Sequence, residues 1–93
     1  MSDRSISIPE RFDFSYHKDF TEQYQRVLAE GGTSKIALDF SKVSYLDSSA
    51  LGMMVLFQKK AKNQNISVCI RGAKESAKEI LLIANFDRLF DIS

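Results

Sequence analysis

The stretch with the clearest potential for chemistry is Asp47-Ser48-Ser49, three consecutive short side chains that carry oxygen. It follows the apolar residue Leu46 and precedes a strongly apolar segment, so we expect it where a strand ends and a helix begins. Such side chains satisfy the free N–H groups of a first helical turn, and each cap stabilises a helix by about 1 kcal/mol. Helix capping is therefore the simplest interpretation of these residues.

The helix expected after this stretch has two features that a cap does not require. Gly52 lies one turn inside it, where glycine costs roughly 1 kcal/mol relative to alanine and suggests a close approach to the backbone. The helix is also apolar nearly all round, because it contains Ala50, Leu51, Met53, Met54, Val55, Leu56 and Phe57. Either a neighbouring helix covers what the sheet does not, or an exposed patch contacts a partner.

Nucleophilic catalysis by Ser48 or Ser49 has little support in the sequence. Both are unactivated alcohols, and no Gly-x-Ser-x-Gly elbow surrounds them. His17 is the only histidine that could act as their base. A small hydrolase is thus the weakest of the functions considered, and we expect no enzyme activity and no cofactor.

Length and charge restrict the class of protein. The chain has 93 residues, of which 44% are hydrophobic and 27% charged, so we expect one globular domain spanning residues 1–93. Thirteen basic and twelve acidic residues give a formal charge of +1, which argues against nucleic acid as a partner. The oligomeric state stays open, because Pro9 and a partly exposed sheet face would tolerate a monomer or a weak dimer.

Cysteine content and hydropathy indicate the compartment. Cys69 is the only cysteine, which excludes an intrachain disulfide, and together with the single His17 it is too little for a zinc site. No signal peptide is visible, and the longest apolar run, 53–57, is too short to cross a bilayer. We therefore expect a cytoplasmic protein without a metal site and without membrane insertion.

Apolar periodicity predicts alternating strands and helices. Strands are expected around Ile6 and Ile8, over 35–40 and over 66–70, with a short strand at the end. Helices are expected over 16–29, 49–62 and 73–84, the first capped by Ser15 and ended by Gly31-Gly32. Pro9 limits the first strand to an edge or a bulge, and 10–14 is expected to continue it. Such alternation predicts a mostly parallel sheet, with helices on one face and the other partly open.

Segment 35–54 resembles the signature of the STAS family, whose founding members are anti-sigma factor antagonists. The shared pattern is a strand, a short turn with an apolar end, and then Asp47-Ser48-Ser49-Ala50-Leu51-Gly52. Arg11-Phe12-Asp13 stands where the family has a Gly-x-Leu-Asp element, and 85–90 resembles its closing turn. The resemblance covers nearly the whole chain. It implies a STAS-like α/β fold with a small, mostly parallel or mixed sheet of four or five strands and three helices.

The resemblance also implies a serine switch. In the family's bacterial regulators a partner kinase phosphorylates the serine directly after the aspartate, which here is Ser48. Asp13, Asp47 and Ser49 would shape that site, and Ser49 would cap the helix or contact the partner. The dephosphorylated protein would bind an anti-sigma factor, or a similar signalling partner such as a serine protein kinase, and a serine phosphatase would restore it. The residues expected to touch the partner are Ser49, Ala50, Gly52, Met53, Met54 and Phe57.

Some positions depart from the family pattern. Ala50 replaces the commoner glycine, Arg11 replaces the glycine of the amino-terminal element, and Pro9 interrupts the first strand region. The chain ends where the family often has a further helix, which leaves open how far the partner surface extends. An alternative function stays open: a non-phosphorylated STAS subunit of a membrane transporter ATPase complex.

Overall fold

The computed structural model describes residues 2–92, with side chains from residue 3 onward, and is built around a parallel sheet. Its four strands follow the order β1-β3-β5-β6, and all three pairings are parallel. Their bounds are β1 Ser2–Ser7, β3 Thr33–Asp39, β5 Ser67–Arg71 and β6 Asp91–Ile92. A second, two-stranded parallel sheet pairs β2 (Arg11–Phe12) with β4 (Tyr45–Leu46). The α/β fold expected from the sequence is confirmed.

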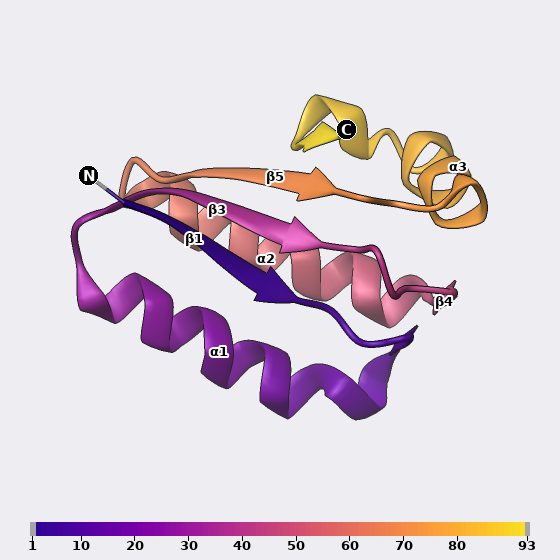
Figure 1. Ribbon diagram of the computed structural model, residues 1–93, viewed down its shortest axis with the longest axis horizontal. Coiled ribbons are helices and arrows are strands. Elements are labelled where there is room, and N and C mark those ends of the chain that lie inside the picture. Colours follow the sequence, from indigo (N-terminus) through magenta and orange to yellow (C-terminus); the bar gives the residue numbers. More distant parts are fainter. Residues whose placement is uncertain (1, 93) are drawn as a thin grey trace.

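Three α-helices connect these strands, close to their predicted bounds. They are α1 (His17–Glu30), α2 (Ser48–Asn63) and α3 (Glu75–Ile83), with short 3-10 turns η1 (Phe14–Tyr16) and η2 (Phe86–Arg88). The predicted end of α1 is confirmed, because Gly31 at its carboxyl end has a φ of 74°, a conformation that glycine adopts without strain. Figure 1 shows α1 and α2 running along the sheet, next to each other.

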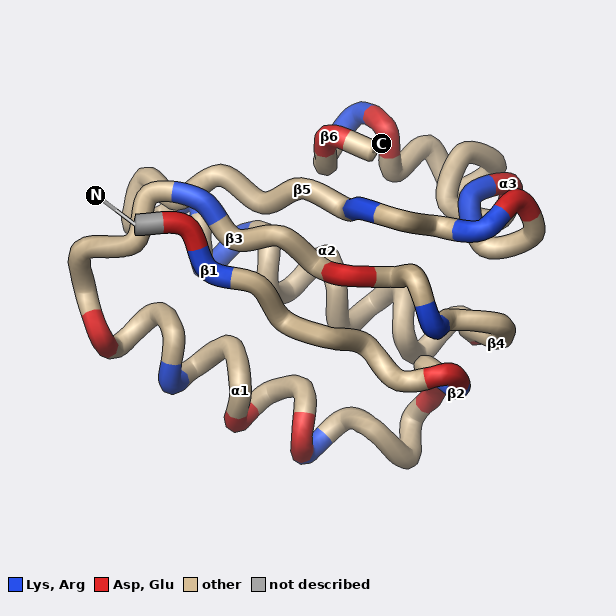
Figure 2. The backbone as a smooth tube through the Cα atoms, in the orientation of Figure 1, with Lys and Arg blue, Asp and Glu red and all other residues tan. Residues whose placement is uncertain are grey.

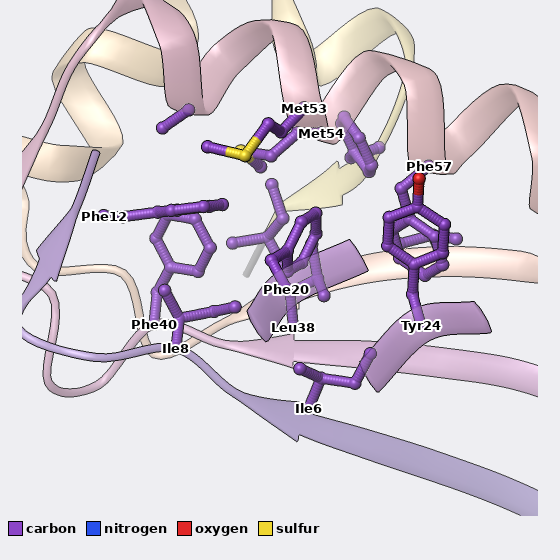
Figure 3. Close-up of a cluster of buried hydrophobic side chains, with 14 of the residues drawn as sticks. Ile6, Ile8, Phe12, Phe20, Tyr24, Leu38, Phe40, Met53, Met54 and Phe57 are labelled. Atoms are coloured by element: carbon purple, nitrogen blue, oxygen red, sulfur yellow. The ribbon is translucent and has the colours of Figure 1, made fainter. Parts of the chain in front are cut away.

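The core lies between the sheet and the helices. Phe12, Phe20 and Phe57 are fully buried, and their rings meet edge to face at 5.2 Å (Phe12–Phe20) and 5.7 Å (Phe20–Phe57). Figure 3 shows these rings below α2, together with the methionine side chains of that helix. Ala77 and Leu81 of α3 belong to the same buried cluster. All three helices therefore contribute to one core.

The opposite face of the sheet is lined by small and polar side chains. Ser5, Ala37 and Cys69 lie beside one another in register on β1, β3 and β5, and Ser5 is exposed. Within residues 2–92, no helix crosses in front of these strands in Figure 1. Figure 2 shows charged positions of both signs on β1 and β3. The helices thus lie largely on one side of the sheet, as expected.

The amino-terminal segment differs from the prediction in two respects. Residues 10–14 do not continue β1: Arg11 and Phe12 leave the main sheet and pair with β4 instead. The Ile8 N–H still donates to the Asp39 carbonyl at 3.0 Å, but Pro9 has no N–H to extend that edge. Ser15 is not a helix cap, because its own N–H donates to the Asp13 carboxylate, which caps η1. A 3-10 turn therefore precedes α1, which begins at His17.

Candidate functional site

Ser48 is the first residue of α2, one position earlier than predicted. Asp47 holds the cap position, where the backbone is extended and its carboxylate accepts a hydrogen bond from the Ala50 N–H at 2.9 Å. The expectation that Ser49 caps the helix is therefore wrong, since Asp47 already occupies that role. The Ser48 side chain is exposed, and Ser49 is half-buried. The first residue of α2 is therefore accessible to solvent.

The small second sheet connects the amino-terminal segment to this serine. Phe12 pairs with Leu46 on the parallel strands β2 and β4, and its carbonyl accepts a hydrogen bond from the Asp47 N–H at 3.3 Å. Asp13 and Ser48 each follow directly after one end of that bond. The structure thus brings Asp13 to the start of α2, although 35 positions separate Asp13 from Ser48 in the sequence.

The Asp13 carboxylate is held in a network of its own segment. It accepts hydrogen bonds from the N–H of Ser15 at 3.0 Å and from the Ser15 hydroxyl, and it forms an ion pair with Arg11 at 3.2 Å. The Ser15 side-chain hydrogen bond is the largest cause that lowers the pKa of Asp13 below its usual range, with Arg11 adding to it. Asp13 is therefore an anion at neutral pH, beside the start of α2.

Arg11 is a member of the site that sequence reasoning did not select. Its guanidinium carbon lies 4.6 Å from the centre of the exposed Tyr45 ring on β4, at a distance typical of a cation–π contact. The same guanidinium binds Asp13. The only signal for Arg11 in the sequence was that it replaces the glycine of the STAS pattern at this position. The contacts of Arg11 depend on the pairing of β2 with β4.

The partner-contact residues expected on α2 are mostly inside the protein. Ala50, Met54 and Phe57 are fully buried and Met53 is only 8% exposed. Figure 3 shows Met53, Met54 and Phe57 directed toward the side chains of the core. We call these four residues the inner face of α2. The expectation that they touch a partner is wrong for this structure, because the sheet and α1 cover them.

The solvent side of the same helix has a different set of residues, which we call the outer face of α2. Ser48, Gly52 and Leu56 repeat every four positions, so they lie in a row, and all three are exposed. Leu56 is 48% exposed and was not among the residues expected to touch the partner. A Cβ built on Gly52 would meet no atom within 4 Å. Packing within the described chain therefore does not explain the glycine.

Two further properties of the described residues bear on metal binding and on membrane insertion. Across residues 2–92, no three side chains of the histidine, cysteine, aspartate or glutamate type gather in a group that could hold a metal ion. None of the helices found in that part of the chain has both the length and the apolar character needed to cross a bilayer.

Comparison with known proteins identifies the family of this chain. Residues 3–93 match the STAS domain. The chain is 38% identical over 89 residues to a STAS-domain containing protein of Pseudomonas aeruginosa, covering 96% of this chain and 86% of that relative. The motif at 46–52 and the segment 11–13 therefore both lie within the residues that match the STAS domain.

Two solved structures are similar in fold. The anti-sigma factor antagonist SpoIIAA in its unphosphorylated form superposes with a TM-score of 0.82 at 11% identity, covering all of this chain and 82% of that one. A sulfate transporter family protein from Wolinella succinogenes gives 0.79 at 15% identity, covering 97% and 75%. At such identities these likenesses concern the fold. With the sequence match and the fold in agreement, this chain belongs to the STAS domain family.

Proposed function

We propose that this protein is a regulatory binding protein switched by phosphorylation of Ser48. The form with a free Ser48 hydroxyl binds an anti-sigma factor or a similar signalling partner, and so releases a sigma factor. The observation that carries the proposal is the exposed Ser48 at the first position of α2, directly after the capping Asp47. The likeness in fold to an anti-sigma factor antagonist solved in its unphosphorylated form supports it.

The covalent step needs an accessible hydroxyl, and Ser48 offers one. A serine protein kinase transfers the γ-phosphoryl group of ATP to the Ser48 oxygen, which loses its proton, and ADP is released. A serine phosphatase hydrolyses the ester to restore the hydroxyl and release inorganic phosphate. Because the hydroxyl already lies at the surface, neither reaction requires α2 to unfold.

The added phosphate changes the surface more than the fold. Phosphoserine brings a charge of about −1.5 to −2 at neutral pH. The free N–H groups in the first turn of α2 favour an anion at this point, while the neighbouring Asp47 and Asp13 oppose it. Since these effects oppose each other, the helix has little reason to rearrange.

A partner that covers the outer face of α2 is much more sensitive to that charge. It must bury or expel a dianion at Ser48, which costs about 2–5 kcal/mol when the charge is unmatched. Each 1.4 kcal/mol is a tenfold loss of affinity. The exposed Leu56 and the open backbone at Gly52 give such a partner an apolar, close contact.

The switch is tested by comparing variants of the two serines. The partner is first captured from the native cell, with and without phosphatase treatment, and its affinity is then measured by titration calorimetry. We expect Ser48→Ala to bind like the unmodified protein and Ser48→Asp to bind at least tenfold more weakly. Ser49→Asp is the matched control for an added charge one residue away. Equal affinities for Ser48→Ala and Ser48→Asp, or a phosphopeptide that carries the phosphate on Ser49, would contradict the proposal.

The fold likeness to the sulfate transporter family protein favours one alternative, a non-phosphorylated STAS subunit of a membrane transporter ATPase complex. Such a subunit acts by docking alone. Under this alternative, phosphate is absent from Ser48 in the cell, and both Ser48→Ala and Ser48→Asp leave the ATPase activity of the complex unchanged.

A further inference from the structure

Arg11 is the basic residue of the small sheet that leads into Ser48. Its guanidinium lies over the Tyr45 ring at 4.6 Å and binds the Asp13 carboxylate at 3.2 Å. Both contacts are to residues within three positions of the link between Phe12 and Asp47, after which Ser48 begins α2. Figure 2 shows acidic and basic positions together around β2. The cation thus lies on the small sheet whose carboxyl end leads, through Asp13 on one strand and Asp47 on the other, to Ser48.

The present partner of Arg11 is replaceable. The Arg11 side chain is 66% exposed, and its ion pair with Asp13 spans only two residues of the same segment, so this pair contributes little to stability. The arginine binds the Oδ2 atom of Asp13, whereas the Oδ1 atom accepts hydrogen bonds from the Ser15 N–H and hydroxyl that do not depend on the arginine. Releasing Arg11 from Asp13 therefore leaves neither group without partners.

We propose that Arg11 is the internal counter-ion of phosphorylated Ser48, and that it exchanges the Asp13 carboxylate for the phosphate. The inference rests on the proposed function, since it concerns the regulation of the same serine. A phosphate dianion attracts a guanidinium more strongly than a carboxylate does, and Arg forms paired hydrogen bonds with phosphate oxygens. The Tyr45 ring contacts the guanidinium, so the exchange would start from a side chain that is already held against the small sheet.

Such an exchange would fix the charge of the switched state. The second pKa of a free phosphoserine is about 6, so part of it is singly charged at mildly acidic pH. A nearby cation favours the dianion and lowers that pKa, whereas the Asp13 and Asp47 carboxylates favour the monoanion and raise it. With Arg11 in contact, the phosphorylated form keeps its full negative charge over a wider pH range.

The experiment measures this pKa directly and does not depend on the kinase. Phosphoserine is inserted at position 48 during translation, and its phosphorus resonance is followed by NMR from pH 4 to 8 at an ionic strength of about 0.15 M. We expect Arg11→Gln to raise the second pKa by about 0.3–0.6, and Arg11→Lys to raise it by less. Asp13→Asn, which keeps an acceptor for Ser15, is expected to lower it.

A matched control exists in the same chain. Arg4 also forms an exposed ion pair, with Glu30 at 2.8 Å, and lies on β1 away from the small sheet. Arg4→Gln removes the same charge and is expected to move the phosphate pKa by less than about 0.1, because charges beyond a Debye length are screened. An Arg11→Gln shift no larger than that of Arg4→Gln overturns this inference. It leaves the proposed switch standing, because that switch is judged by the affinities of the Ser48 variants.

Discussion

The two faces of α2 differ in whether packing within the protein explains their residues. On the inner face, Met54 and Phe57 are fully buried against the sheet and α1, so their size and apolar character are explained by packing. On the outer face, neither Gly52 nor the half-exposed Leu56 is explained by contacts within the described chain. Exposed residues that packing does not explain, next to the exposed Ser48, are the ones to examine for function.

The comparison also shows why an apolar composition is a poor guide to a binding surface. A helix that is apolar all round was compatible with an exposed methionine patch. In the structure the methionines fill the core, and the exposed side of the helix is smaller and less apolar. The contact surface therefore depends on how the helix is rotated about its axis, which the positions of α1 and the sheet decide.

The largest effect is expected from truncating the inner face. Phe57→Ala removes a ring that stacks on Tyr24 at 4.8 Å and meets Phe20 at 5.7 Å. We expect a loss of about 3–5 kcal/mol in the free energy of unfolding, measured by urea denaturation. Leu56→Ala, one residue along, is the matched control and is expected to stay within about 0.5 kcal/mol. Equal losses for the two variants would show that the faces are wrongly assigned.

A smaller effect is expected where the two faces meet, at the helix start. Asp47→Ala removes the carboxylate that accepts from the Ala50 N–H, and we expect a loss of about 1 kcal/mol. Ser48→Ala is expected to leave the unfolding free energy nearly unchanged, because Ser48 is exposed and Asp47 is the cap. A greater loss for Ser48→Ala than for Asp47→Ala would assign the capping role to the serine.

The smallest effect has the opposite sign and belongs to the outer face. Gly52→Ala puts a methyl group into open space in a helix interior, so the variant is expected to be more stable by about 0.5–1 kcal/mol. In a domain of this size, 1 kcal/mol raises Tm by roughly 4–8 °C. Under the proposed function the same variant binds its partner more weakly, because the backbone is no longer bare. A lower Tm would mean that the glycine is needed for folding.

Much of the fold could be predicted because its signals are local. The spacing of Phe20, Tyr24 and Leu28 defines one face of α1, and Gly31 ends it. Ile36 and Leu38 point to the same side of β3 as an alternating strand requires. The predicted ends of α2 and β5 differ from the observed ends by one residue, because single hydrogen bonds decide where a helix or strand ends.

The features that could not be predicted depend on contacts between segments that are far apart in the sequence. The two-residue strands β2 and β4 exist because the fold brings Phe12 and Leu46 together. The contact of Arg11 with Tyr45 depends on the same pairing. The position of Ser48 at a strand–helix junction could be predicted from its motif. Which side of α2 faces a partner could not, since apolar residues occur all around the helix. That Ser48 accepts phosphate stays a prediction.

The hydrogen bond between the Phe12 carbonyl and the Asp47 amide has a consequence for anyone who reshapes this chain. Trimming or replacing the first dozen residues would remove the edge strand and, with it, the anchor that holds the beginning of α2. A tag or fusion partner is therefore better attached through a spacer than in place of this segment. Loss of the segment would change the backbone position of Ser48, although the two are far apart in the sequence.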